Sequence, residues 1–299
     1  MELHTSTYDG KPAFLFLDED EQVVELPTEF MHSLVLSPQK YASGTFSRYA
    51  EKLRDLCRFL ARHEVYGQVR VDEALANLKR PALSAFYRSL QAGGQQAATV
   101  RLAEAAVRKF TEWLNTDEAG YIHDRPLYPE HASGLTPPPN KRQPRYLAHS
   151  QVIELAQTMR FEAQRLVTHF MFDTGLRVSE VPRVLKKDLP DWRHYPDGQM
   201  YFPLLVRGSK GRGGQFKERY TIISRPMLSR LARHHNTKRY QFNLDFEENE
   251  RPALLNVFGD KWTKDAIEKL IEKARDKTSI PSASSHMLRH GTSFSILRS

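Results

Sequence analysis

Prolines divide this sequence into two parts. Six of them fall between Pro126 and Pro144, within DRPLYPEHASGLTPPPNKRQPRY, where apolar residues show little periodicity. Because proline has a fixed φ and no amide hydrogen, neither a helix nor a central strand continues through such a stretch. The 299 residues, 40% of them hydrophobic, are enough to build a core on each side of it. The sequence therefore predicts a linker over 117–144 between two domains.

The segment before the linker has the apolar spacing of helices. Over 45–63, apolar side chains recur at steps of three and four residues, which places them on one helix face: Phe46, Tyr49, Leu53, Leu56 and Leu60. Similar spacing predicts helices over 81–90 and 99–114. We therefore expect a helical bundle over 41–116.

Residues 1–40 are different in charge. They hold eight acidic residues against two lysines, a net charge of −6, whereas the whole chain carries +8, so residues 41–299 carry +14. Two apolar runs around a polar turn, AFLFLDEDEQVVEL, predict a β-hairpin over 13–26 within an acidic N-terminal extension. The basic remainder favours nucleic acid as the partner, and a basic protein without such a partner stays open as the alternative.

Several classes of protein are excluded. The sequence has no run of eighteen apolar residues and no signal-peptide pattern at its N-terminus, so we expect a cytoplasmic location. Its single cysteine, Cys57, allows neither an intrachain disulfide nor a cysteine-based zinc site, and it reads as a small core residue.

Beyond the linker, the pattern is helical again around one hairpin. Ser150 is a plausible N-cap for a helix ending near Met159, helical spacing resumes over 161–172, and a further helix is expected to start after Gly175. The remaining elements are a hairpin over 200–223 and helices over 225–236 and 263–276. The predicted class is mainly α with a small β-sheet (α+β), and the second domain spans 145–299.

Arg177 and Glu180 form the first group that could carry chemistry. The arginine follows a glycine turn at the expected start of a helix, and Glu180 lies one turn further on. A guanidinium held from behind by a carboxylate can grip a phosphate through two parallel hydrogen bonds. An ordinary surface pair at i,i+3 is the simpler alternative.

Lys210 lies in a basic, glycine-rich turn. RGSKGRGGQFKER, residues 207–219, holds five basic groups and one acid. Glycines let such a hairpin approach a polyanion closely, and a lysine at its tip could donate a proton to a leaving alkoxide. A solvated turn that contacts phosphates without chemistry fits the same composition.

The segment SHMLRH carries two histidines and an arginine. His286 and His290 have the i,i+4 spacing of zinc ligands, but Met287 stands where the zinc-peptidase pattern needs a glutamate base. The neighbours His234 and His235 do not share a helix face, so they form no better metal site. Arg289 would repel a metal ion and stabilise a phosphate. His286 and Arg289 are therefore interpreted as a second phosphate clamp, and no metal is expected.

Together these motifs resemble the tyrosine recombinase, or phage integrase, family. TFSRYAEKLRDLCRFL and ATVRLAEAAVRKFTEWL look like its helical, SAM-like core-binding domain, and YLAHSQVIELAQ looks like the opening of its catalytic domain, which has the DNA breaking-rejoining fold. TGLRVSE is similar to the segment with the first catalytic arginine, and HMLRH to the His-x-x-Arg box. The resemblance assigns catalytic roles to Arg177, Lys210, His286 and Arg289, and supporting roles to Glu180 and His290. The loop around Lys210 is longer than in the family, and Arg212 and Lys217 are rivals for the role of the lysine. The basic composition of the hairpin predicts DNA contacts for Arg207, Arg212, Lys217 and Arg219.

The resemblance implies a mechanism without metal or other cofactor. Two arginines, a histidine and a lysine neutralise one scissile phosphate of double-stranded DNA while a tyrosine attacks it and forms a 3′-phosphotyrosyl link. A second strand can reverse the step, and a homotetramer on two DNA sites is implied.

The sequence departs from the family at two places. Pro182 follows RVSEV, where the family continues a helix, and only nine residues follow His290, where the family has some tens and the tyrosine. Tyr201, Tyr220 and Tyr240 precede the box and are expected to be strand or core residues. We therefore expect no nucleophile in this chain and a truncation before it.

Three functional hypotheses follow. The first is a site-specific recombinase for DNA integration or a related exchange, of which this chain is an incomplete version. The second is a DNA-binding or regulatory module that occupies sites without cutting. A type IB topoisomerase would share the active-site chemistry, but the N-terminal layout favours a recombinase.

Overall fold

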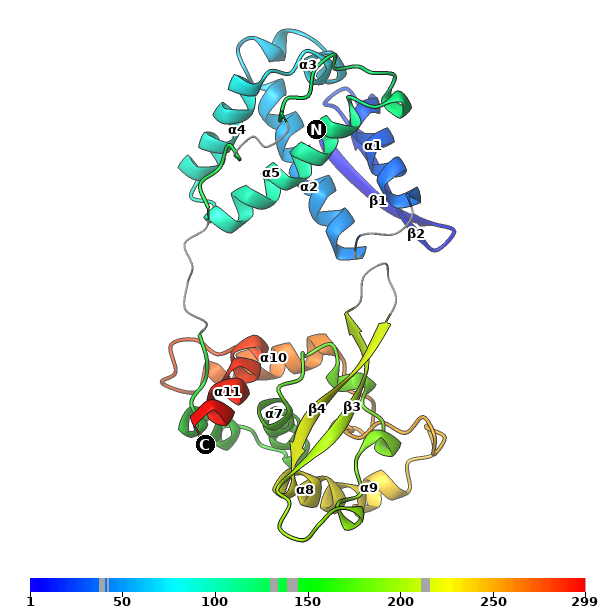
Figure 1. The fold of residues 1–299 in the computed structure, drawn as a ribbon, viewed down its shortest axis with the longest axis vertical. Coiled ribbons are helices and arrows are strands. Elements are labelled where there is room, and N and C mark those ends of the chain that lie inside the picture. Colours follow the sequence, from blue (N-terminus) through cyan, green and yellow to red (C-terminus); the bar gives the residue numbers. More distant parts are fainter. Residues whose placement is uncertain (38–40, 42, 130–133, 139–144, 211–215, 299) are drawn as a thin grey trace. The chain divides into compact units, whose positions relative to one another are not determined.

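The computed structural model describes the chain except residues 38–40, 42, 130–133, 139–144, 211–215 and 299 (Figure 1). The side chains of 43, 209, 210, 216 and 293–298 are also outside the described part. The described residues form two compact units, one within 1–141 and the other within 142–299. The predicted class, mainly α with small antiparallel sheets, is confirmed.

The first unit is a helical bundle with one hairpin. Its elements, apart from two short 3-10 turns, are β1 (Glu2–Tyr8), β2 (Lys11–Leu17), α1 (Glu25–Leu36), α2 (Ser43–Ala61), α3 (Val71–Ala76), α4 (Arg80–Ala92) and α5 (Ala97–Trp113). The three helices predicted from apolar spacing correspond to α2, α4 and α5. Cys57 is buried on α2, as expected.

The N-terminal residues belong to the same core as these helices. Phe16 of β2 and Met31 of α1 are fully buried in the cluster that also contains Leu53 of α2. Phe30 meets Phe110 of α5 edge to face at 5.4 Å between ring centroids. Burial of such large apolar side chains is the dominant favourable term in folding, so β2 and α1 are structural parts of this unit.

The hairpin predicted over 13–26 is wrong in position. The strands are β1 and β2, paired from Glu2↔Leu17 to Tyr8↔Lys11. Asp9 and Gly10 make the turn with φ of 49° and 71°, the positive values that a tight two-residue hairpin turn requires. The acidic run is instead a loop, in which Asp18 Oδ1 accepts hydrogen bonds from the amides of Asp20 and Gln22.

The second unit places helices around a hairpin. Its main elements are α6 (His149–Gln157), α7 (Glu162–Thr174), β3 (Tyr201–Lys210), β4 (Phe216–Ser224), α8 (Arg225–His235), α9 (Lys238–Gln241), α10 (Lys264–Arg275) and α11 (Ser285–Arg298). The hairpin predicted over 200–223 is confirmed, with an irregularity in pairing between Val206 and Ser209.

Two local predictions in this unit are wrong. Ala148, not Ser150, is the N-cap of α6, and the Gln151 side chain accepts a hydrogen bond from the Ala148 amide at 2.9 Å. No α-helix begins between Gly175 and β3, where the chain forms turns and three short 3-10 turns, the first of them Val181–Arg183. Pro182 has no amide hydrogen to donate to such a helix, which explains the difference.

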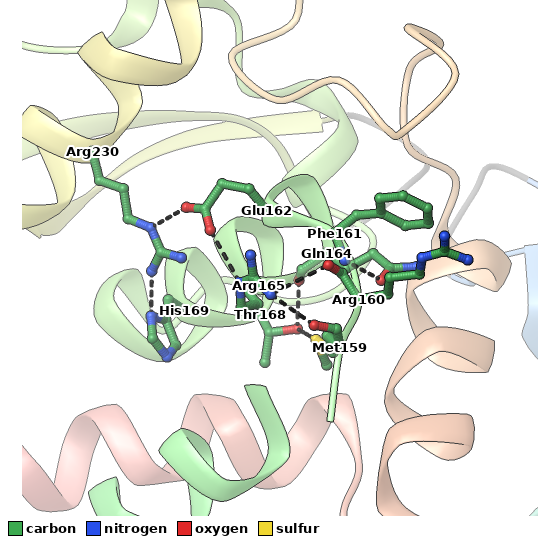
Figure 2. A network of polar contacts seen from close by, with 9 residues as sticks. All are labelled: Met159, Arg160, Phe161, Glu162, Gln164, Arg165, Thr168, His169 and Arg230. Atoms are coloured by element: carbon green, nitrogen blue, oxygen red, sulfur yellow. Dashed lines mark hydrogen bonds and ion pairs between the residues drawn. The ribbon is translucent and has the colours of Figure 1, made fainter. Parts of the chain in front are cut away.

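An ion-pair network joins α7 to α8. Glu162, at the first turn of α7, accepts hydrogen bonds from Arg165 Nε at 3.1 Å and from Arg230 Nε of α8 at 2.7 Å (Figure 2). Arg230 also contacts His169 Nδ1. Burial alone would raise the pKa of Glu162, but the two guanidiniums lower it below its ordinary value. The network fixes the helix that leads into the site described next.

Candidate functional site

Arg177 lies in a tight turn directly after α7. Gly175 ends that helix in the left-handed conformation, φ 62°, and donates its amide to the Met171 carbonyl. The turn from 177 to 180 is closed twice. The Glu180 amide donates to the Arg177 carbonyl at 2.8 Å, and the Arg177 amide donates to Glu180 Oε2 at 2.9 Å. Arg177 is thus fixed by this turn rather than by the helix start that the sequence suggested.

Glu180 is the centre of the site. Its side chain is 2% exposed and faces three arginines. Oε1 accepts from Arg177 Nη1 at 2.8 Å and Oε2 from Arg219 Nη2 at 2.7 Å, and Arg289 Nη1 lies 4.0 Å from Oε2. Burial would raise the pKa of Glu180, but the hydrogen bonds from Arg219 and Arg177 lower it. The carboxylate is therefore ionised and holds a cluster of cations.

Close packing on α7 positions α11, which carries Arg289 and His286. Leu288 is fully buried, and the Thr292 hydroxyl donates to the Phe172 carbonyl. A Cβ at Gly291 would lie 2.5 Å from both the Leu147 carbonyl oxygen and the Phe172 ring, so only glycine allows this approach. The helix face with Arg289 is thereby held against the Glu180 turn.

The cluster has more positive charge and more donors than Glu180 can satisfy. Three guanidiniums and one carboxylate leave a net charge of +2. Arg289 Nη1 and Arg219 Nε are buried and have no hydrogen-bond partner among the described residues. Burial and the charge of Arg177 lower the pKa of Arg289, against the opposing effect of Glu180. Such an arrangement suits an anion with several acceptor oxygens, such as a phosphate diester.

His286 and His290 contact each other beside this cluster. Their Nε2 atoms are 3.0 Å apart, so one ring donates a hydrogen bond to the other. Burial, followed by the nearby His290, Arg289 and Arg177, lowers the pKa of His286. The imidazole is therefore neutral near pH 7 and can donate or accept a single hydrogen bond.

The structure separates the basic residues of the hairpin. Arg207 is neutralised by Asp188 at 2.8 Å and Glu218 at 2.9 Å, whereas Lys217 is exposed. Lys210 is the last residue of β3, with its side chain outside the described part, and Arg212 lies outside the described residues.

Arg219 is the member of the cluster whose place the sequence analysis missed. It was predicted as a DNA contact, and it lies against Glu180. The alternation of side chains along β4 could have indicated this position, because Arg219 shares a strand face with Thr221 and the buried Ile223.

The three tyrosines considered above have other surroundings. Tyr240 is buried, and its hydroxyl donates to the Pro252 carbonyl at 2.7 Å. Tyr220 is adjacent to Arg219 on β4 and so projects from the opposite strand face, and Tyr201 begins β3. The predictions of strand and core positions for these residues are confirmed.

Within the part of the chain that the structure describes, no three His, Cys, Asp or Glu side chains gather where they could hold a metal ion. Among the same residues, no helix combines the length and apolarity needed to cross a bilayer.

The chain is similar to known phage integrases and tyrosine recombinases. Residues 29–118 match the family model "Phage integrase, N-terminal SAM-like domain". The tyrosine recombinase XerC of Listeria monocytogenes is 25% identical over 294 residues, covering 95% of this chain and 83% of that protein. The chain is thus similar to tyrosine recombinases over nearly its whole length. The resemblance noted in the sequence is thereby confirmed, and DNA binding and site-specific recombination are the activities of such recombinases.

Solved structures of recombinases share the fold. The XerH site-specific recombinase in a post-cleavage complex with a palindromic difH substrate aligns with a TM-score of 0.63, at 16% identity, over 91% of this chain and 83% of that one. A lambda integrase tetramer bound to a Holliday junction aligns with a TM-score of 0.61, at 14% identity, over 90% and 71%. At these identities the alignments establish the architecture alone.

Proposed function

We propose that this chain binds duplex DNA at recombination sites and takes part in strand exchange through a 3′-phosphotyrosyl intermediate. Arg177, His286 and Arg289 surround the scissile phosphate, Lys210 of the hairpin completes the catalytic set, and Glu180 and His290 support it. The observation that carries the proposal is the cluster on Glu180, in which the cations outnumber the carboxylate and two buried donors have no hydrogen-bond partner among the described residues.

The chemistry of these groups fits phosphoryl transfer. The attack of a hydroxyl on a phosphodiester adds negative charge to the oxygens of the phosphorus, and guanidiniums fixed in advance stabilise that charge without reorganisation. The 177–180 turn and Glu180 fix Arg177, and the close packing of α11 fixes Arg289. A neutral His286 can donate one hydrogen bond to a phosphate oxygen, and the hairpin lysine can protonate the leaving oxygen.

The attacking tyrosine is a separate part of the proposal. Tyr240 is committed to a buried hydrogen bond, and Tyr201 and Tyr220 belong to hairpin strands. We propose that none of these three is the nucleophile and that this chain alone forms no covalent DNA adduct. A DNA-binding module that occupies sites without cutting is the second candidate, and this same observation favours it.

The proposed assembly is based on the solved structures of similar recombinases. The lambda integrase neighbour is described as a tetramer on a Holliday junction, and the XerH neighbour as a complex with its DNA substrate. We propose a homotetramer on two DNA sites, acting in the cytoplasm. Lys217 and Arg212 are the hairpin residues proposed to contact the DNA backbone.

A combination of protein and DNA changes tests the clamp. After selection of a bound duplex from a random pool, each phosphate is replaced in turn by a neutral methylphosphonate. We expect one position per half-site where the wild-type chain loses about 1–2 kcal/mol of binding free energy. Arg177→Ala and Arg289→Ala should each lose affinity for the unmodified duplex and show a smaller loss than the wild type at that position, because each variant keeps one arginine of the pair.

The control is Arg207→Ala, because Asp188 and Glu218 already neutralise that guanidinium. It should respond to the methylphosphonate as the wild type does. A chain that selects no duplex refutes the proposed function. The same duplex, nicked beside that phosphate, tests the nucleophile. A denaturant-resistant protein–DNA band would show that a tyrosine of this chain attacks.

A further inference from the structure

Arg219 shares Glu180 with Arg177 and Arg289, the two arginines of the proposed phosphate clamp. Each carboxylate oxygen has its own guanidinium: Oε1 accepts from Arg177, and Oε2 accepts from Arg219 at 2.7 Å. Arg289 is next to Oε2 but lies 4.0 Å away, and its Nη1 has no hydrogen-bond partner among the described residues. The presence of Arg219 on Oε2 thus coincides with a free donor on Arg289.

We propose that Arg219 is a positioning residue, which occupies Glu180 so that Arg289 stays available to the phosphate and which ties the β-hairpin to the clamp. The inference rests on the proposed function for its phosphate, and it replaces the DNA contact predicted for Arg219 from the sequence.

Competition for one oxygen is the physical basis. Glu180 is 2% exposed, so a guanidinium lost from Oε2 could not be replaced by bulk water at full strength. Among the described residues, Arg177 is already bound to Oε1, and Arg289 is the cation that lies beside Oε2. Without Arg219, the guanidinium of Arg289 would close the 4.0 Å gap, form a hydrogen bond to Oε2 and turn away from an incoming phosphate.

The same residue connects the clamp to the hairpin. Arg219 pairs with Val206 across the two strands, and β3 continues from there to Lys210. Two residues along the same face of β4, the Thr221 hydroxyl donates to the Thr174 carbonyl at the end of α7 at 2.7 Å. Thr221 and Arg219 thus hold β4 at two points on either side of Gly175, and they set the register of the strand whose partner carries Lys210.

A direct DNA contact is the competing role, and salt dependence separates the two. A phosphate contact adds about 0.9 to the slope of log affinity against log salt for B-DNA. Lys217, exposed on the same strand face as Arg219, is the matched control because its removal changes the net charge equally. For random-sequence duplex, Lys217→Ala should reduce the slope by about 0.9. Arg219→Ala should leave the slope as it is in the wild type.

The titration of His286 reports on Arg289 without DNA. Arg289 is among the groups that lower the pKa of His286. If Arg219→Ala lets Glu180 neutralise Arg289, the pKa of His286 rises toward its ordinary value, which NMR of the ring protons measures. The His286 signal is identified by its loss in His286→Gln. Arg219→Lys retains a cation that can reach Glu180 and should restore much of the wild-type titration.

The salt slope and the pKa of His286 together decide whether Arg219 has the positioning role. An unchanged slope with a raised pKa of His286 supports the positioning role. A slope reduced as in Lys217→Ala, or a pKa of His286 that does not rise, overturns it. If Arg219→Ala does not fold, Arg219→Lys and Arg219→Gln are compared in its place, with the pKa of His286 expected to rise in the glutamine variant. If the wild type binds no duplex, the proposed function fails, and the His286 titration still tests Arg219.

Discussion

Two buried glutamates, one in each unit, have opposite surroundings. Glu104 of α5 accepts hydrogen bonds from the amides of Leu135 and Thr136 and from the Thr136 hydroxyl, all of them neutral donors. Glu180 accepts instead from guanidiniums. Around Glu104 every donor has its acceptor, and the carboxylate fixes residues 134–136 to the helix. Around Glu180 donors and positive charge are left over. A closed network stabilises a fold, whereas one with excess cations is prepared for an anion.

Replacement of each glutamate by alanine should give the largest difference in unfolding free energy between the two sites. Glu180→Ala leaves guanidiniums facing one another without their carboxylate, and we expect the second unit to lose about 3 kcal/mol of unfolding free energy. Glu104→Ala leaves only neutral donors unpaired and should cost the first unit about 1–2 kcal/mol. Urea titration, followed by the indole NMR signals of Trp113 in one unit and Trp192 and Trp262 in the other, measures both.

The glutamine variants sharpen this result. Glu104→Gln keeps an acceptor for neutral donors and should be milder than Glu104→Ala. Glu180→Gln removes the charge that the arginines need and should remain nearly as harmful as Glu180→Ala. Equal responses of the two sites to glutamine would contradict the distinction drawn between them.

Acid should weaken the second unit through its histidines. Burial, and then the charge of His235, lowers the pKa of His234 from 6.5 to about 4, and the pKa values of His169, His235 and His286 are lowered as well. A histidine with a lowered pKa binds fewer protons in the folded than in the unfolded state. Stability is therefore complete above pH 6.5 and is lost as the pH falls toward 4.

The size of the acid effect can be assigned to one residue. The displaced pKa of His234 corresponds to about 3 kcal/mol, lost gradually between pH 6.5 and pH 4. His234→Gln should remove most of that slope from the Trp192 and Trp262 signals, whatever its effect on stability at pH 7.5. A variant that keeps the full slope would show that His234 is not its source.

Local sequence patterns predict much of the fold. Apolar spacing identified α2, α4 and α5, and alternating residues around glycines identified the β3–β4 hairpin. The first hairpin was misplaced because the acidic run was read as its turn, although Asp9 and Gly10 are the residue types that adopt positive φ. Elements whose geometry is set by neighbouring residues were accessible in this way.

The site was accessible only in part, for a physical reason. Arg177 and Glu180 are three residues apart, and His286 and Arg289 share one motif, so local sequence identifies each pair. The approach of Arg219 to Glu180 joins residues 39 positions apart and depends on how β4 packs on α7. Distance along the chain hides such a contact, whereas the basic composition of the hairpin is visible in the local sequence and predicts DNA contacts.

Alanine substitutions at two glycines, one beside each site, should give the smallest effects in the comparison of Glu104 with Glu180. A Cβ at Gly291 would meet the Leu147 carbonyl oxygen and the Phe172 ring at 2.5 Å, and neither can move without shifting α6 or α7. A Cβ at Gly134 would meet Glu104 Oε2 at 3.0 Å, the far end of a side chain. We expect Gly291→Ala to cost about 2 kcal/mol and Gly134→Ala less than about 1 kcal/mol.

The two glycine variants should differ more in their response to the methylphosphonate than in their stability. Gly291→Ala displaces the helix that carries Arg289 and should weaken the response to the methylphosphonate in whatever fraction stays folded at 10 °C. Gly134→Ala disturbs only the closed network of the first unit, so it should retain that response in full. If Gly134→Ala weakened the response as much as Gly291→Ala, the phosphate would have to be held by the first unit as well, and the assignment of the anion to the Glu180 cluster alone would fail.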